Sequence, residues 1–424
     1  IFDIQTQKNV ANTHVLFQPD TKPIPNTDGM ESDNDSSKTS STATTATKQG
    51  PRLYALWEGG LPHEIDPVTL ETIGGETDLD GTLGERYAAH YKIDPDTKTV
   101  CNFCINVQPK THTIQVFEHD LESMELLYSK EYSGFSGIGV SHDCAITKDY
   151  FVFLQSPTKF DPLPFVLGKK GPAECIEDDK EATASSLILI PRGKEQKEPI
   201  IIETPKMFTF HLANAFQDEN TLVADMILAD SMMMSAPKDT GYPEQPIWET
   251  FDFDNGLKYQ LRRVRVDLAT GSFLSMKSMT DGIANCEFPV VNPNVVGKDY
   301  HYAYIGSSNT VHRNGVVQGL AKVDVKKEKV VEQWRPRQHE FLGEVAFCPR
   351  TSGVGEDNGY LVGYLLNGKA KSSELVFFDA KAINSGPISR TKLNYMVNFS
   401  LHGTFVPGFT PEMTSEVVSA FQNL

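Results

Sequence analysis

The stretch VDLATG at residues 266–271 shows the pattern that decides the fold. An apolar residue is followed by an Asp, a short turn and another strand-like segment. The same order recurs as IDPVT (65–69), IDPDT (93–97), VDVKK (323–327) and FDAK (378–381). An Asp at the start of a tight turn accepts hydrogen bonds from the backbone amides that follow it, which stabilises a hairpin. The repeated pattern therefore predicts a series of antiparallel hairpins.

The segments around these turns have the composition of β-strands. Residues 53–57, 150–154, 187–190 and 360–365 are rich in β-branched and aromatic side chains, which favour strands. The Asp residues of the last three turns are 57 and 55 positions apart, which is roughly compatible with propeller blades of about 40–50 residues. The sequence therefore predicts an all-β protein and favours a β-propeller, with any other large antiparallel β fold as the alternative. The best helix signal is an amphipathic segment from Thr410 to Leu424.

Composition excludes several classes of function. The chain has 424 residues and a formal net charge of −17, so a nucleic-acid partner is not expected, because phosphate binding needs a basic surface. An apolar run long enough to span a bilayer, about 18 residues, is absent from the sequence. Cys101 and Cys104 form a CxxC pair with no second ligand pair at zinc spacing, so we expect the cysteines to be free thiols.

Two segments are predicted to be loops. Residues 21–50 are almost entirely polar and cannot bury enough apolar surface to offset the entropy of ordering, so a disordered insertion is expected. Residues 174–186 are acidic and are expected to form a shorter loop.

Three of the eleven histidines lie in apolar surroundings, namely His142, His211 and His402. A buried imidazole needs a partner on each ring nitrogen, or a metal on one of them. For a single histidine a hydrogen-bonded core residue is the simpler interpretation, but several together favour a metal site. The motifs HExxH, GxxxxGK[ST] and GxGxxG are absent, and Ser136 lacks the strand–turn–helix context of a hydrolase nucleophile.

Three glutamates supply the second half of a possible metal site. Glu58, Glu287 and Glu344 each lie in an apolar segment, where an unpaired charge would cost several kcal/mol. Each of them could form a buried salt bridge. Alternatively, each could accept the ring N–H of a metal-bound histidine and so fix its tautomer.

Nine motifs taken together resemble the carotenoid cleavage oxygenase family. In chain order they are LYALWEGGLPHEIDP (53–67), AAHYKIDPDT (88–97), SHDCAITKDYFVFL (141–154), FHLANAF (210–216), EFPVVNP (287–293), LGEVAFCPR (342–350), EDNGYLVGYLLN (356–367), SSELVFFDA (372–380) and LHGTFVP (401–407). The resemblance extends from about Asn12 to Pro407. It implies one seven-bladed propeller domain over residues 1–424, with a helical or loop cap over a ferrous iron on the propeller axis.

The resemblance also assigns roles to individual residues. The implied iron ligands are His90, His142, His211 and His402. Reasoning from the residues alone passes over His90, because its neighbours Tyr91 and Lys92 look like ordinary surface. Glu58, Glu287 and Glu344 match the carboxylates that orient the ligands. The implied reaction is O₂-dependent cleavage of a conjugated C=C bond of a carotenoid or apocarotenoid to two carbonyl products, with no catalytic residue beyond the metal centre.

Other functions within and outside the family stay open. These are a stilbenoid-cleaving oxygenase, a retinoid-type isomerohydrolase, and a non-catalytic propeller that binds lipophilic ligands. Trp57 stands where stilbenoid cleavers carry a lysine, which favours a polyene substrate and makes Trp57 a candidate pocket residue. Residues Pro162–Leu167 align with the family's membrane-docking patch, with a loop packed on the core as the alternative.

The sequence departs from the family at its start. The family's ANT motif is already present at residues 11–13, so we expect N-terminal strands to be missing and one blade to be incomplete. Signals upstream of Ile1 would be invisible. Localisation is therefore left open between the plastid and the cytoplasm, with peripheral membrane attachment also compatible.

Overall fold

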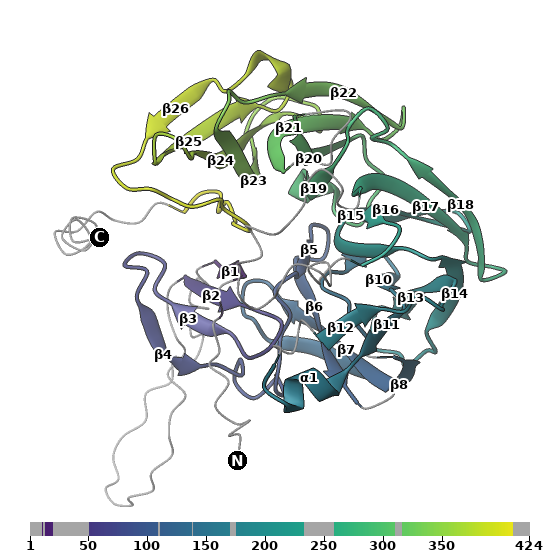
Figure 1. Ribbon diagram of the computed structural model, residues 1–424. Coiled ribbons are helices and arrows are strands. Elements are labelled where there is room, and N and C mark those ends of the chain that lie inside the picture. Colours follow the sequence, from purple (N-terminus) through teal and green to yellow (C-terminus); the bar gives the residue numbers. More distant parts are fainter. Residues whose placement is uncertain are drawn as a thin grey trace, which may run out of the picture.

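The protein is a β-propeller in the residues that its structure describes. The computed structural model describes residues 11, 13–19, 51–108, 111–137, 139–169, 175–232, 258–309 and 316–409. These residues form six four-stranded antiparallel sheets and one two-stranded sheet. Figure 1 shows the sheets around a common centre, with β15, β19 and β23 close to it and β18, β22 and β26 towards the rim. The all-β propeller is thus confirmed, whereas the seventh blade and the cap stay predictions.

The sheets follow one another in chain order, and each is one blade. The first three are β1 His14–Gln18, β2 Arg52–Leu56, β3 His63–Ile65 and β4 Thr72–Glu76; β5 Lys92–Asp94, β6 Thr99–Val107, β7 Thr111–Asp120 and β8 Leu126–Ser136; and β9 Ala145–Ile146, β10 Tyr150–Gln155, β13 Ala184–Pro191 and β14 Ile200–Pro205. The next three are β15 Phe208–Asp218, β16 Thr221–Ala229, β17 Gln260–Asp267 and β18 Ser272–Ser278; β19 Cys286–Val291, β20 Tyr302–Ser308, β21 Val317–Asp324 and β22 Lys329–Trp334; and β23 Glu340–Pro349, β24 Gly359–Asn367, β25 Ser372–Asp379 and β26 Ser389–Lys392.

The Asp-containing turns connect strands within the blades, as the sequence predicts. Asp66 Oδ1 accepts the backbone N–H groups of Val68 and Thr69, each at 2.8 Å, between β3 and β4. Asp267 Oδ1 does the same for Ala269 and Thr270 between β17 and β18. These carboxylates satisfy amides that the tight turn would otherwise leave unpaired. The local turn chemistry therefore sets where one strand ends and the next begins.

The hydrophobic core lies between neighbouring blades. One cluster joins Val152 of β10 and Leu189 of β13 to Met226 of β16 and Val264 of β17, all fully buried. Similar clusters link the other consecutive blades. The central strands β10 and β16 are buried along almost their whole length, whereas β24 alternates between more and less buried side chains. This packing holds the inner strands in fixed positions around the axis.

The predicted acidic loop at 174–186 is only partly correct. β11 (Thr158–Phe160) pairs with β12 (Ile176–Asp178), and β13 begins at Ala184. The acidic side chains are accommodated because Lys206 Nζ lies 2.8 Å from Asp178 Oδ2 and Lys159 Nζ lies 2.8 Å from Asp179 Oδ1. The predicted insertion at 21–50 and the predicted helix at 410–424 lie outside the described residues.

Helices are short in the part of the chain that the structure describes. α1 (Pro162–Val166) is followed later by the 3-10 helices η3 (Pro293–Val295) and η4 (Ile383–Ser385). None of the described helices is long and apolar enough to cross a membrane. All six cysteines are buried and free, as expected.

Candidate metal centre

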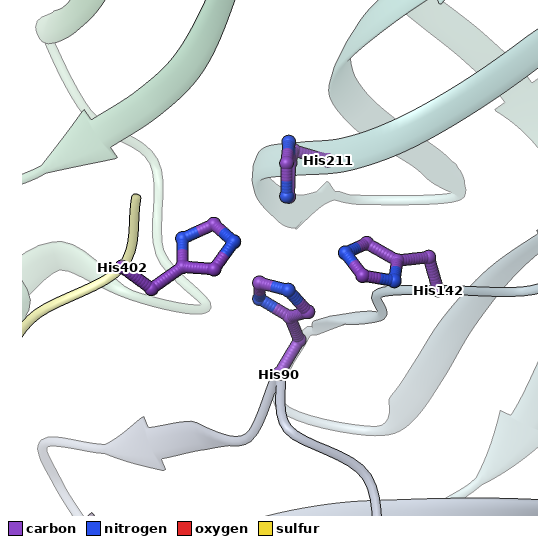
Figure 2. Close-up of side chains that lie close together, drawn as sticks. All are labelled: His90, His142, His211 and His402. Atoms are coloured by element: carbon purple, nitrogen blue, oxygen red, sulfur yellow. The ribbon is translucent and has the colours of Figure 1, made fainter. Parts of the chain in front are cut away.

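Four histidines from different parts of the chain point toward one common position (Figure 2). They are His90, His142, His211 and His402, and one ring nitrogen from each lies within 4.8 Å of those of the others. The ring centroid of His90 is 4.4 Å from those of His142 and His402 and 5.0 Å from that of His211. Imidazole nitrogens that share one first-row metal ion each lie about 2 Å from it, so opposite ligands are about 4 Å apart. A small contraction would allow all four to bind a single ion.

Irregularities in the inner strands direct site residues toward the axis. The register of β15 shifts between Thr209 and Leu212, on either side of His211. The register of β19 shifts between Glu287 and Val290, and that of β23 shifts between Leu342 and Val345, around Glu344. A bulge adds a residue to one strand and re-aims its side chains. In these three inner strands, one histidine and two glutamates therefore depart from the regular alternation of side chains between the two faces of the sheet.

Each of three histidines has a glutamate at its Nδ1 atom. The distances are 2.6 Å from His142 to Glu58 Oε1, 2.6 Å from His211 to Glu287 Oε2, and 3.0 Å from His402 to Glu344 Oε2. A carboxylate at Nδ1 keeps the proton there and leaves Nε2 with its lone pair free for a metal. The three carboxylates also give the site negative charge, which favours a divalent cation.

The lowered pKa of His90 and two unpaired ring nitrogens fit metal binding, whereas the pKa of His211 is raised, so a metal would compete with a proton there. Burial and the neighbouring histidines hold the pKa of His90 well below its usual value of 6.5, so this ring is neutral and able to coordinate. Burial alone would lower the pKa of His211, but Glu287 raises it above 6.5 through its charge and hydrogen bond. The Nε2 atoms of His90 and His211 are buried without a hydrogen-bond partner. Buried polar atoms are rarely left unpaired, so these two nitrogens fit a metal ion.

Aromatic rings and a cavity both border the cluster. Phe210 packs edge-on against His142 at 5.7 Å, and Phe288 lies 5.8 Å from His211 and 6.1 Å from His402. A cavity of about 250 Å³ is lined by three of the histidines, by polar side chains such as Lys92 and Asp143, and by apolar side chains such as Val290, Val345 and Phe347.

Two residues near the centre were not identified from the sequence. His14 of β1 lies with its ring 5.6 Å from that of His402, and its Nδ1 is 3.1 Å from the carbonyl oxygen of Ala89. Asp143 follows His142 and exposes only 3% of its surface. The proximity of Asp143 to a candidate ligand was a signal that sequence reasoning did not use, whereas nothing local distinguishes His14.

Trp57 and the segment Pro162–Leu167 lie in different environments. The Trp57 ring covers Gly59, where an added Cβ would come within 2.6 Å of it, and the indole Nε1 is buried without a partner.

Leu163, Val166 and Leu167 are 61%, 63% and 55% exposed. The core-packed alternative for this segment is therefore wrong for these three side chains, while the substrate role of Trp57 stays a prediction.

Comparison with known proteins agrees with this geometry. The family model described as retinal pigment epithelial membrane protein matches residues 3–407. The chain belongs to this family, which includes the carotenoid cleavage oxygenases.

Individual relatives share both sequence and fold. The chain is 34% identical to the apocarotenoid-15,15'-oxygenase of Synechocystis, over 85% of this chain and 72% of that protein. It is 28% identical to a carotenoid 9,10(9',10')-cleavage dioxygenase of Phaseolus vulgaris, over 84% of this chain but only 64% of that protein. A solved structure of a Synechocystis ACO mutant covers 96% of this chain with a TM-score of 0.80 and 31% identity. A cobalt-substituted Synechocystis ACO covers 83% of this chain and 71% of its own, with a TM-score of 0.75 and 32% identity.

Proposed function

We propose that this protein is a non-haem iron(II) dioxygenase that cleaves a conjugated C=C bond of a carotenoid or apocarotenoid into two carbonyl products. The observation that carries this proposal is the convergence of four histidines, two of which have buried and unpartnered Nε2 atoms. The names of the relatives in Synechocystis and Phaseolus vulgaris support the substrate class.

His90, His142, His211 and His402 would hold the iron through neutral imidazoles. Four such ligands leave the dipositive charge of the ion uncompensated by a direct carboxylate ligand, unlike a two-histidine-one-carboxylate site. Ferrous iron bound there would supply the position at which O₂ meets the substrate double bond. Glu58, Glu287 and Glu344 would keep the Nδ1 protons in place and the rings aligned.

The aromatic residues beside the cluster would bind the polyene. Phe210 packs edge-on against Phe208 and stacks with Tyr259, with ring centroids at 4.7 and 6.4 Å. Phe288 extends this surface to Phe399, at 6.3 Å. Flat apolar rings match a conjugated chain in shape and polarity. They would hold the double bond beside the iron and exclude water from it.

A stilbenoid substrate is the alternative that a specific observation favours. The lignostilbene-alpha,beta-dioxygenase isozyme III of Sphingomonas paucimobilis is 27% identical over 84% of this chain. Trp57 argues against this alternative, because the indole offers no cation to a phenol at the position where stilbenoid cleavers carry a lysine. An apocarotenoid and a stilbenoid should therefore both be tested as substrates in the same assay.

The decisive experiment combines metal analysis with isotope labelling. The protein is loaded anaerobically with Fe(II), its iron content is measured, and it is incubated with an apocarotenal or with lignostilbene under ¹⁸O₂. We expect about one iron per chain and labelled carbonyl products from the apocarotenal. Failure to retain iron would refute the proposal. An unlabelled isomer as the product would identify isomerisation in place of oxidative cleavage, and labelled aldehydes from lignostilbene alone would identify a stilbenoid cleaver.

We also propose that the protein extracts its substrate from a membrane surface through α1. Leu163, Val166 and Leu167 are exposed apolar side chains, and Lys169 beside them is exposed as well. An apolar group next to a cation suits shallow insertion among anionic lipids. This would give a soluble propeller access to a lipophilic polyene.

A further inference from the structure

Asp143 is a buried carboxylate that connects its own segment to two others. Its Oδ1 accepts a hydrogen bond from Lys92 Nζ at 2.8 Å and another from the N–H of Cys144 at 2.7 Å. Its Oδ2 accepts the backbone N–H of Leu212 at 2.8 Å. Both oxygens are therefore used, and they face different segments.

Each of these segments carries one of the four converging histidines. Lys92 is two residues after His90, Asp143 is next to His142, and Leu212 is next to His211. The segments belong to three consecutive blades, those that begin with β5, β9 and β15. A bridge between His90 and Asp143 joins two of them through the backbone as well. Asp143 thus connects the segments that carry three of the four candidate ligands.

His90 shows why such a connection matters. The rings of His142, His211 and His402 are each held by a glutamate, as described above. The His90 segment is held instead through its backbone and its neighbours, by contacts that include the hydrogen bond of Tyr91 to the Val15 carbonyl. Two of these contacts, the bridge to Asp143 and the Lys92–Asp143 ion pair, are the ones that lead toward His142 and His211. Asp143 therefore contributes to the position of His90 relative to these two histidines.

We propose that Asp143 is a positioning residue that holds the segments of His90, His142 and His211 at the spacing that a shared metal ion requires, with Lys92 balancing its charge. This inference rests on the proposed metal centre. Lys92 is needed because a carboxylate buried at this depth without a cation beside it would be strongly destabilising. A carboxylate is needed because it presents acceptors on both oxygens, whereas an amide turns an N–H₂ group toward at least one of the donors.

The test compares metal affinity in Asp143→Asn with that in a matched control. Co²⁺ is the probe, because a cobalt-substituted relative has been solved, and its binding is followed by absorbance titration. We expect Asp143→Asn to raise the dissociation constant for Co²⁺ about 10- to 100-fold, the usual effect of losing a partner that supports metal ligands. The control is Asp225→Asn, which alters a fully buried carboxylate that pairs with Arg263 at 2.7 Å. We expect this variant to lose stability but to bind Co²⁺ as the wild type does.

A second readout reports on the hydrogen bonds themselves. In the metal-free protein, hydrogen exchange in peptides that cover residues 209–214 should be faster in Asp143→Asn than in the wild type, because the Leu212 amide loses its acceptor. The Lys92→Met variant keeps the Leu212 contact, so we expect a smaller rise in the Co²⁺ dissociation constant, about 3- to 10-fold.

The outcomes separate this inference from the proposed function. If the wild type does not bind Co²⁺, the proposed metal centre is wrong. If the wild type binds Co²⁺ and folded Asp143→Asn binds it within twofold of the wild type, the role of Asp143 is wrong. If Asp143→Asn does not fold, Lys92→Met decides, and an affinity within twofold of the wild type would overturn the inference.

Discussion

Nδ1 of His211 lies 2.6 Å from Oε2 of Glu287, although the two residues belong to different blades and are 76 positions apart in the chain. The same carboxylate oxygen accepts the N–H of Phe288 at 2.6 Å, which fixes its direction. The contact joins the inner strands β15 and β19 and determines which nitrogen of His211 faces the centre of the cluster. The orientation of a candidate ligand therefore depends on a neighbouring blade.

Replacing Glu287 should weaken metal binding. In Glu287→Gln the side chain keeps its size but loses its charge, so His211 is held less firmly and its Nε2 becomes a poorer ligand. We expect the dissociation constant for Co²⁺ to rise about 10- to 100-fold. The matched control is Glu340→Gln, at a buried carboxylate that pairs with Arg390 at 2.8 Å. Equal affinities in the two variants would contradict the assigned role of Glu287.

Removing a ligand should have a larger effect. His211→Ala takes away one of four converging nitrogens and is expected to abolish metal binding, measured as iron per chain after anaerobic loading. The control is His14→Asn, which changes a nearby ring outside the four-histidine set but leaves an amide that can donate to Ala89. We expect this control to retain its iron. An iron-containing, active His211→Ala protein would refute the ligand assignment.

Gly343 lies so close to Ser400 that a substitution adding one methyl group can test how the segment of His402 is positioned. A Cβ at this position would lie 2.0 Å from Ser400 Oγ and 2.6 Å from the Ser400 carbonyl oxygen. That carbonyl accepts the N–H of Glu344 at 3.3 Å, so Gly343→Ala should push the segment of His402 away from β23.

We expect Gly343→Ala to lose about 1–3 kcal/mol of unfolding free energy and to bind metal more weakly, measured by thermal unfolding with and without Co²⁺. Gly75→Ala is the control, because an added Cβ there meets nothing within 4 Å. A Co²⁺-induced stabilisation of Gly343→Ala equal to that of the wild type would show that the contact does not position His402.

His119 predicts a pH dependence of stability that is separate from the metal site. Burial lowers the pKa of this fully buried ring from 6.5 to about 4 in the folded protein, so the unfolded chain binds the proton more readily. The resulting stability is present above pH 6.5 and is lost as the pH falls from there toward 4.

In His119→Gln, the loss of unfolding free energy that comes from protonating His119 should be absent. Between pH 7 and pH 5 the wild type should lose about 2 kcal/mol more unfolding free energy than the variant, measured by urea denaturation of the metal-free proteins. Parallel pH profiles for the two proteins would show that His119 does not contribute.

The exposed apolar side of α1 predicts lipid binding. A double variant with Leu163→Glu and Val166→Glu should bind less well to vesicles of mixed phosphatidylcholine and phosphatidylserine in a sedimentation assay, because two charges would have to enter the interface. The control is Leu274→Glu, at a side chain of β18 that is 51% exposed. If all three proteins sediment equally with vesicles, α1 does not dock on membranes.

The sequence by itself determined the local structure and part of the site. Asp267 and its counterparts predict hairpin turns because a carboxylate captures amides two and three residues away, an interaction that needs no tertiary contact. His142, His211 and His402 are recognisable because each lies in an apolar segment. Reasoning from the residues did not identify His90, because Tyr91 and Lys92 resemble surface residues, and only the family resemblance added it.

Only the tertiary structure decided how these residues meet. The bulges in β15, β19 and β23 turn site residues toward the axis, and the packing between blades brings together side chains that are far apart in the chain. Lys92 looked like a solvated cation, yet it pairs with Asp143 beside the candidate metal centre. Turn chemistry depends on adjacent residues, whereas the spacing of four ligands depends on the arrangement of whole blades.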